Sequence, residues 1–168
     1  MKDIALVVGH DWSSKGAYSS ILGMSEYDFM LAVAKKTCLD WYVHNPHYSY
    51  RRKMKNTYSK LAHYDLTIEL HFNAAMPSAN GVECFYYHTN QEGKEISKKY
   101  CDFIADRYNV RNRGAKPLSN RNQRGYYAIA SGIPTGILVE PFFGTNPEAN
   151  KYTIDNYAAA LSEFCRLL

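Results

Sequence analysis

The chain has 168 residues, of which 46% are hydrophobic and 21% charged, and its formal net charge is +4. This composition is ordinary for a soluble globular protein. No apolar run approaches the ~20 residues that span a bilayer, and the apolar segment that follows residues 1–3 is too short for a signal peptide. We therefore expect a single domain over residues 1–168, made in the cytoplasm and without stable membrane insertion.

The N-terminal half is predicted to begin with a buried strand at residues 4–8, which ends at His10. Ser25 has the spacing of a helix N-cap, and the apolar residues behind it recur at three and four positions. This pattern predicts a helix that continues toward Pro46, where proline ends it. Further on we expect a short edge strand, a helix and a second buried strand, at residues 48–50, 56–64 and 65–71.

The C-terminal half is predicted to alternate strands with helices around one long polar loop. Residues 82–87 have the alternation of a strand, and an apolar stripe marks a helix across residues 92–107. Residues 109–125 are rich in Arg and Asn and are predicted to be irregular. Two strands and a C-terminal helix follow, at residues 126–130, 137–140 and 157–168. The alternation predicts an α/β fold, with a twisted, mostly parallel mixed sheet of about six strands and helices on both faces.

Three of the predicted buried strands end at an ionisable residue: His10, His71 and Glu140. An imidazole or a carboxylate in so apolar a segment needs a partner, because burying it alone is costly. Open α/β sheets bind ligands at the carboxyl ends of their strands, so we expect the three residues to share one site. Histidine and glutamate are also the residue types of a catalytic zinc site and its base.

Six short segments resemble, in the same order, the motifs of one enzyme family. They are VVGH with KGA (7–17), Glu26, ELHFNA (69–74), GVECFYY (81–87), RGAK (113–116) and ILVEPFFGTN (137–146). On these residues the chain resembles the zinc-dependent N-acetylmuramoyl-L-alanine amidases of the AmiC/CwlV type, the Amidase_3 family, which includes phage endolysins. The chain departs from the family at Asp11–Trp12 and at Pro141, each of which stands where the family has a glycine.

The resemblance implies that His10, Glu26 and His71 bind one Zn²⁺ ion and that Glu140 is the catalytic residue. Apart from the resemblance, Glu26 is explained by its favourable place in the first turn of a helix. The implied reaction is hydrolysis of the amide bond between N-acetylmuramic acid and the L-alanine of the peptidoglycan stem peptide. Without a signal peptide or a separate cell-wall-binding domain, the chain resembles an endolysin that reaches the wall after release, in host cell lysis.

Two other functions remain open: a zinc-dependent amidase or peptidase that acts on other bonds of cell-wall peptides, and a catalytically inactive wall-binding module. Residues 51–55 form a basic cluster, which is usually a solvated face. No nucleic-acid-binding motif accompanies it, so no nucleic-acid partner is expected. The expected partner is peptidoglycan, and the sequence defines no oligomeric state.

The remaining histidines are predicted to be exposed: His44, His47, His63 and His88. Three cysteines are predicted to be buried, reduced thiols on apolar helix faces: Cys38, Cys101 and Cys165. Asp11 and Glu69 flank the two histidines of the predicted site. Each is a candidate hydrogen-bond partner for an imidazole N–H, since metal-binding histidines usually have such a partner.

Overall fold

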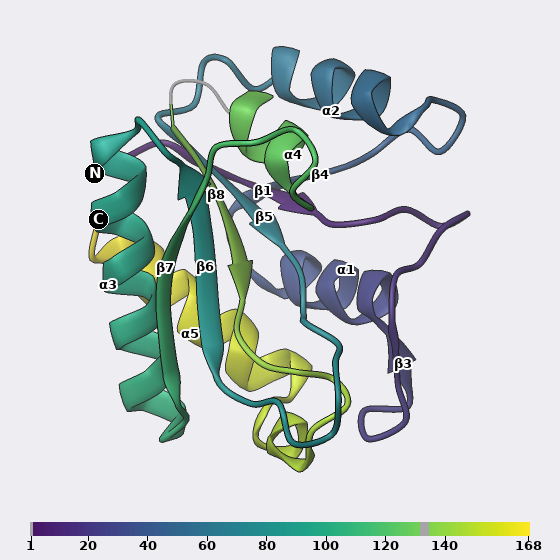
Figure 1. Ribbon diagram of the computed structural model, residues 1–168, viewed down its shortest axis with the longest axis vertical. Helices are drawn as coiled ribbons and strands as arrows, with labels where there is room; N and C mark the ends of the chain where they lie inside the picture. Colours follow the sequence, from purple (N-terminus) through teal and green to yellow (C-terminus); the bar gives the residue numbers. More distant parts are fainter. Residues whose placement is uncertain (1, 132–134) are drawn as a thin grey trace.

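The computed structural model describes residues 2–131 and 135–168. Six strands form a mixed sheet in the order β4 (Asp40–Val43), β1 (Ile4–Val8), β5 (Leu66–Leu70), β8 (Thr135–Glu140), β6 (Val82–Tyr87) and β7 (Asn112–Leu118) (Figure 1). The first four are parallel, whereas β6 is antiparallel to β8 and parallel to β7. The predicted α/β fold with a mostly parallel mixed sheet is confirmed.

Helices cover both faces of the sheet (Figure 1). One face packs against α1 (Glu26–Lys36), α3 (Gln91–Tyr108) and α5 (Ile154–Arg166). The other packs against α2 (Tyr50–Ser59) and α4 (Tyr126–Ser131). A hairpin of β2 (Tyr18–Ser19) and β3 (Met24–Ser25) precedes α1, and a 3₁₀ helix, η1 (Pro147–Lys151), precedes α5. Among the described residues, no helix combines the length and apolar character needed to cross a membrane.

The central strands β1 and β5 differ in what they present to the α2 side of the sheet. In β1, Leu6 packs in the core of α1, α3 and α5, and Val7 packs under α2, so both faces are apolar. A strand buried on both faces needs such a continuous apolar run. In β5, Glu69 lies on the α2 side and bonds to Tyr58 of that helix. Glu69 therefore brings a charged group into an otherwise apolar layer, near the carboxyl edge of the sheet.

Three predicted elements were wrong: the strand at residues 48–50, the bounds of the helix at residues 56–64, and the strand at residues 126–130. Residues 48–50 form no strand, and α2 begins at Tyr50 and ends at Ser59, earlier than predicted. Residues 126–130 belong to the short helix α4, in which Ala128 and Ile129 are buried. The periodicity of a short apolar run does not distinguish a strand from a buried helical turn, so it wrongly predicted a strand at residues 126–130.

The predicted long loop and the end of the first helix were also wrong. Strand β7 lies within residues 109–125 and forms one edge of the sheet. Edge strands commonly contain the Lys, Gly and Pro residues that led to the prediction of a loop. Helix α1 ends at Lys36, and the chain then forms β4 beside β1. Cys38 consequently lies beyond the helix and is exposed, whereas Cys101 and Cys165 are buried free thiols as predicted.

Candidate metal centre

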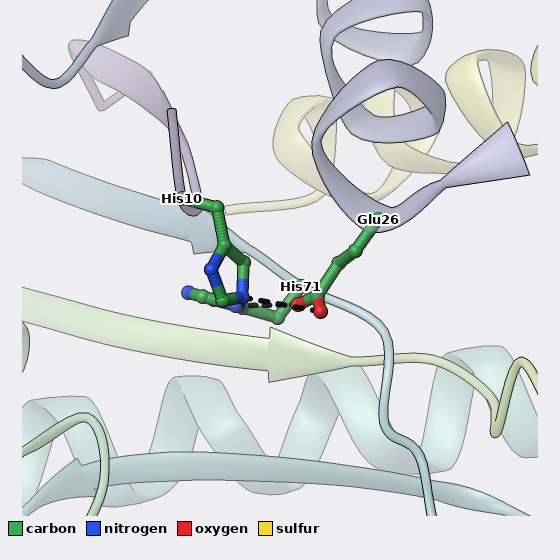
Figure 2. Close-up of side chains that lie close together, drawn as sticks. All are labelled: His10, Glu26 and His71. Atoms are coloured by element: carbon green, nitrogen blue, oxygen red, sulfur yellow. Dashed lines mark hydrogen bonds and ion pairs between the residues drawn. The ribbon is translucent and has the colours of Figure 1, made fainter. Parts of the chain in front are cut away.

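Three side chains that are distant in the sequence converge at the carboxyl edge of β1 and β5 (Figure 2). The possible ligand atoms of His10, Glu26 and His71 all lie within 4.8 Å of one another. Glu26 lies between the histidines: its Oε2 is 3.1 Å from His10 Nε2, and its Oε1 is 2.7 Å from His71 Nδ1. The structure thus brings together the three residues that the sequence nominates as metal ligands.

The two histidines are neighbours because the ends of β1 and β5 are joined. The backbone N–H of Gly9 donates to the Leu70 carbonyl at 3.0 Å, directly before each histidine. His10 has a φ of 64°, a left-handed conformation that is uncommon for a residue other than glycine. Such a conformation costs about 1–3 kcal/mol and persists only where the surroundings impose it. The rings of His10 and His71 meet edge to face, with their centroids 5.1 Å apart.

Glu26 reaches the histidines from the first turn of α1. Ser25 caps this helix by accepting a hydrogen bond from the Asp28 N–H at 3.1 Å, as the sequence predicted. Glu26 makes two hydrogen bonds to the loop before the helix. The Glu26 N–H donates to the Ala17 carbonyl at 2.8 Å, and Glu26 Oε2 accepts from the Ala17 N–H at 3.2 Å. The carboxylate is therefore buried and fixed before any ligand arrives.

The electrostatics of the cluster keep Glu26 ionised. Burial opposes its charge, but hydrogen bonds and charge from His10 and His71 outweigh burial and lower the Glu26 pKa to about 2. Burial also acts to lower the pKa of His71, but its hydrogen bonds to Glu26 and Glu69, together with their negative charges, raise that pKa to about 10. The ionised Glu26 supplies negative charge between the two rings, and a metal ion bound there would displace the extra proton of His71, since a metal-binding imidazole is neutral.

The donor set fits a catalytic zinc ion. Two imidazole nitrogens and one carboxylate are a known zinc ligand set, and they leave a further coordination position open. Gly16 keeps the surrounding space free, because a Cβ atom at this position would lie 2.6 Å from both Glu26 Oε2 and His10 Nε2. Gly16 also has a φ of 73°, which favours glycine. The loop at Gly16 is therefore shaped around the ligand atoms.

Replacing Gly16 with alanine is expected to weaken Zn²⁺ binding by about tenfold or more, the size of effect that perturbed metal surroundings have. The added methyl group would push against Glu26 and His10. Gly23→Ala is the matched control, because Gly23 also has a positive φ, of 67°, but has nothing within 4 Å of its added Cβ. Competition with a chromophoric chelator measures both affinities. Equal affinities in the two variants would contradict the prediction.

Glu140, the predicted catalytic residue, ends β8 directly beside His71. Leu70 pairs with Val139 in the parallel register of β5 and β8, and His71 and Glu140 are the next residues of the two strands. Within the described residues, Glu140 Oε2 is buried and has no hydrogen-bond partner. Burial raises the pKa of Glu140, and although the charge of His71 opposes this, the nearby Glu83 carboxylate adds to the rise. A carboxylate with a raised pKa and one buried oxygen free of hydrogen bonds is a candidate acid–base group.

Glu83 is a second carboxylate of the site, to which the sequence reasoning gave no role. It pairs with Glu140 across β6 and β8. Its Oε1 accepts from Asn73 Nδ2 at 2.6 Å, and its Oε2 accepts from Arg113 Nε at 2.5 Å and from Lys116. Burial acts to raise the pKa of Glu83, but these two cations outweigh it and lower the pKa. Paired carboxylates whose pKa values are driven apart usually have different roles.

Of the two residues predicted to be hydrogen-bond partners of the histidines, Glu69 contacts a histidine and Asp11 bonds to other residues. Glu69 is confirmed as a partner of His71, since its Oε1 lies 2.8 Å from His71 Nε2. Asp11 instead pairs with Lys53 and accepts hydrogen bonds from the loop at Ser13. Among the other histidines, the prediction of exposure was wrong for His44, which turns inward beneath α2 and is only 2% exposed. Three are exposed as predicted: His47, His63 and His88.

An α/β sheet that gathers two histidines and a glutamate at one edge, beside a half-buried second glutamate, has the residue set of a metal-dependent hydrolase. A comparison with protein families is more specific. The family Amidase_3, described as N-acetylmuramoyl-L-alanine amidase, matches residues 4–162. The chain therefore belongs to the N-acetylmuramoyl-L-alanine amidase family. No curated protein matches it.

Several solved structures share the fold at low sequence identity, and one of them is described as an N-acetylmuramoyl-L-alanine amidase. The catalytic domain of the CD27L endolysin, which targets Clostridia difficile, is 24% identical with a TM-score of 0.79, over 99% of this chain and 98% of that one. Cwp6 from Clostridium difficile is 21% identical with a TM-score of 0.79, over 98% of this chain but only 28% of its own. The catalytic domain of CwlV from Bacillus (Paenibacillus) polymyxa var. colistinus is 17% identical, with a TM-score of 0.75, over 99% of this chain and 97% of that one.

Proposed function

We propose that this protein is a zinc-dependent peptidoglycan hydrolase. It cleaves the amide bond between N-acetylmuramic acid and the L-alanine of the stem peptide, and it binds one Zn²⁺ ion per chain. The observation that carries the proposal is the convergence of His10, Glu26 and His71 on one point beside Glu140. Membership of the N-acetylmuramoyl-L-alanine amidase family supports the choice of substrate.

In the proposed reaction, His10, Glu26 and His71 hold the metal, and Glu140 moves the proton. When bound, zinc supplies a Lewis acid that polarises the amide carbonyl and lowers the pKa of water. Glu140 Oε2 accepts a proton from the water that attacks the amide carbon, then donates it to the leaving nitrogen. The raised pKa of Glu140 suits both steps, because a pKa nearer neutrality lets one group accept and release a proton.

Removal of the metal is expected to abolish activity on purified peptidoglycan. The protein should contain about one zinc ion per chain, and a chelator should stop the release of stem peptides until Zn²⁺ is restored, since the implied chemistry needs the Lewis acid. The products should be peptides with a free L-alanine amino group and muramic acid without its peptide. Cuts within the stem peptide would instead support the peptidase alternative, and wall binding without any release would support the inactive module.

We further propose that the protein acts on the cell wall after release, as an endolysin does. The supporting observation is that an endolysin catalytic domain has the same fold. Production of the protein inside bacterial cells is expected to leave them intact until a pore-forming protein opens the membrane, after which the culture should lyse. The Glu140→Gln variant should not lyse the cells under the same conditions. Lysis without membrane opening would contradict this role.

A further inference from the structure

A buried polar network lies on the opposite side of His71 from Glu26. Glu69, on β5, is 3% exposed, and its Oε1 is 2.8 Å from His71 Nε2. Its other oxygen, Oε2, accepts a hydrogen bond from the Tyr58 hydroxyl of α2. His44 Nε2 lies 3.8 Å from the same oxygen, and its Nδ1 is 2.9 Å from Thr57 Oγ1. The network therefore connects a candidate metal ligand to a helix that contributes no ligand.

The packing of this region does not explain why a carboxylate is present. Glu69 lies in the layer between β5 and α2, where Val7, Met54 and Leu61 form an apolar cluster. An apolar side chain of similar size would avoid the cost of desolvating a charge, which a buried ion pair often fails to recover. The simpler explanation is that Glu69 links α2 to the sheet. The contacts of the two His71 nitrogens favour a second explanation, in which Glu69 acts on the metal site.

The two nitrogens of His71 face two different carboxylates. Nδ1 faces Glu26 and the proposed metal position, whereas Nε2 faces Glu69. A neutral imidazole binds a metal through one nitrogen, while the other carries the proton and donates it to a fixed acceptor. With Glu69 accepting the Nε2 proton, Nδ1 is the nitrogen whose lone pair would face a metal ion bound beside Glu26. The Tyr58 hydroxyl fixes Glu69 in turn.

We propose that Glu69, held in place by Tyr58, is a positioning residue that fixes the orientation and tautomer of His71 for metal binding. It acts through His71 and does not contact the metal. The inference rests on the proposed function, because it needs a metal at the site. Zinc affinity, measured separately from activity, distinguishes the proposed function from the role of Glu69. If the wild-type protein does not bind zinc, both proposals are wrong. If it binds zinc and the variants below have unchanged affinity, only the role of Glu69 is wrong.

The first test compares Zn²⁺ affinity in Glu69→Gln and Thr67→Val. Glutamine keeps the shape of Glu69 but removes its charge, and the dissociation constant for Zn²⁺ is expected to rise about 10- to 100-fold. Thr67 is the matched control, because it is 1% exposed on the same strand and bonds to the Thr135 carbonyl. Its valine variant should retain the wild-type affinity. If Glu69 were only structural, both variants would lower the melting temperature of the metal-free protein and neither would change zinc affinity.

The second test uses Tyr58→Phe, which removes one hydroxyl and keeps the ring, so it remains informative if Glu69→Gln does not fold. Zn²⁺ should bind several-fold more weakly, and the visible absorption of bound Co²⁺ should shift because the ligand geometry has loosened. In the Glu69→Gln background the same change should have little further effect, since both act through His71. Wild-type affinity and spectrum in Tyr58→Phe, or fully additive effects in the double variant, would overturn the proposal.

Discussion

Glu140→Gln is expected to lower the rate of peptidoglycan amide hydrolysis by about 10²–10⁴-fold, the range that general acid–base catalysis contributes. Glutamine matches glutamate in shape but cannot take a proton from the attacking water. The metal ligands should be unaffected, because Glu140 is not one of the three residues whose ligand atoms converge. Zinc content, zinc affinity and release of stem peptides, measured on the same preparation, check the prediction.

The matched control is Glu83→Gln, because Glu83 is the other carboxylate of this pair: it is buried and pairs with Glu140 across the sheet. Its loss should destabilise the protein, since Arg113 and Lys116 would lose their shared partner. It should nevertheless retain much more activity than Glu140→Gln, because its oxygens are already engaged. The reverse order, with Glu140→Gln active and Glu83→Gln inactive, would show that the base had been assigned to the wrong carboxylate.

The residues that could be predicted from the sequence are those whose local pattern already reflects burial. His71 and Glu140 each follow an apolar run, and β5 and β8 are adjacent parallel strands, so their ends meet. Glu26 is different: as the first residue of α1 it needs no metal to explain it, and only the family resemblance pointed to it. Its place between the two histidines depends on the loop at Ala17.

The residues that could not be predicted depend on contacts between distant segments. His44 follows an exposed strand and has no local sign of burial, yet it lies beneath α2 near Glu69. Strand β7 has the polar composition of a loop because only one of its edges is paired. Helix α4 is too short for periodicity to separate it from a strand. In each case the tertiary neighbours decide the structure, and the local sequence does not contain them.

His71→Ala and His10→Ala are both expected to abolish zinc binding and activity, but they should differ in their effect on the metal-free protein. His71 contacts the buried carboxylates of both Glu26 and Glu69. Its removal takes one partner from each of two buried carboxylates, and breaking even one buried pair costs about 3–5 kcal/mol of unfolding free energy. His10 contacts only Glu26 of these two, and its side chain is 31% exposed, so its loss should cost much less.

Urea unfolding in the presence of a chelator measures this difference directly, because the chelator removes any contribution of bound metal to stability. The expected order of unfolding free energy is wild type, then His10→Ala, then His71→Ala. In His10→Ala, Glu26 retains its 2.7 Å contact with His71, which accounts for the smaller loss. Equal losses in the two variants would mean that the carboxylates flanking His71 do not depend on it. Zinc binding by His71→Ala would mean that His71 is not a ligand, since the other two residues alone would then suffice to hold the ion.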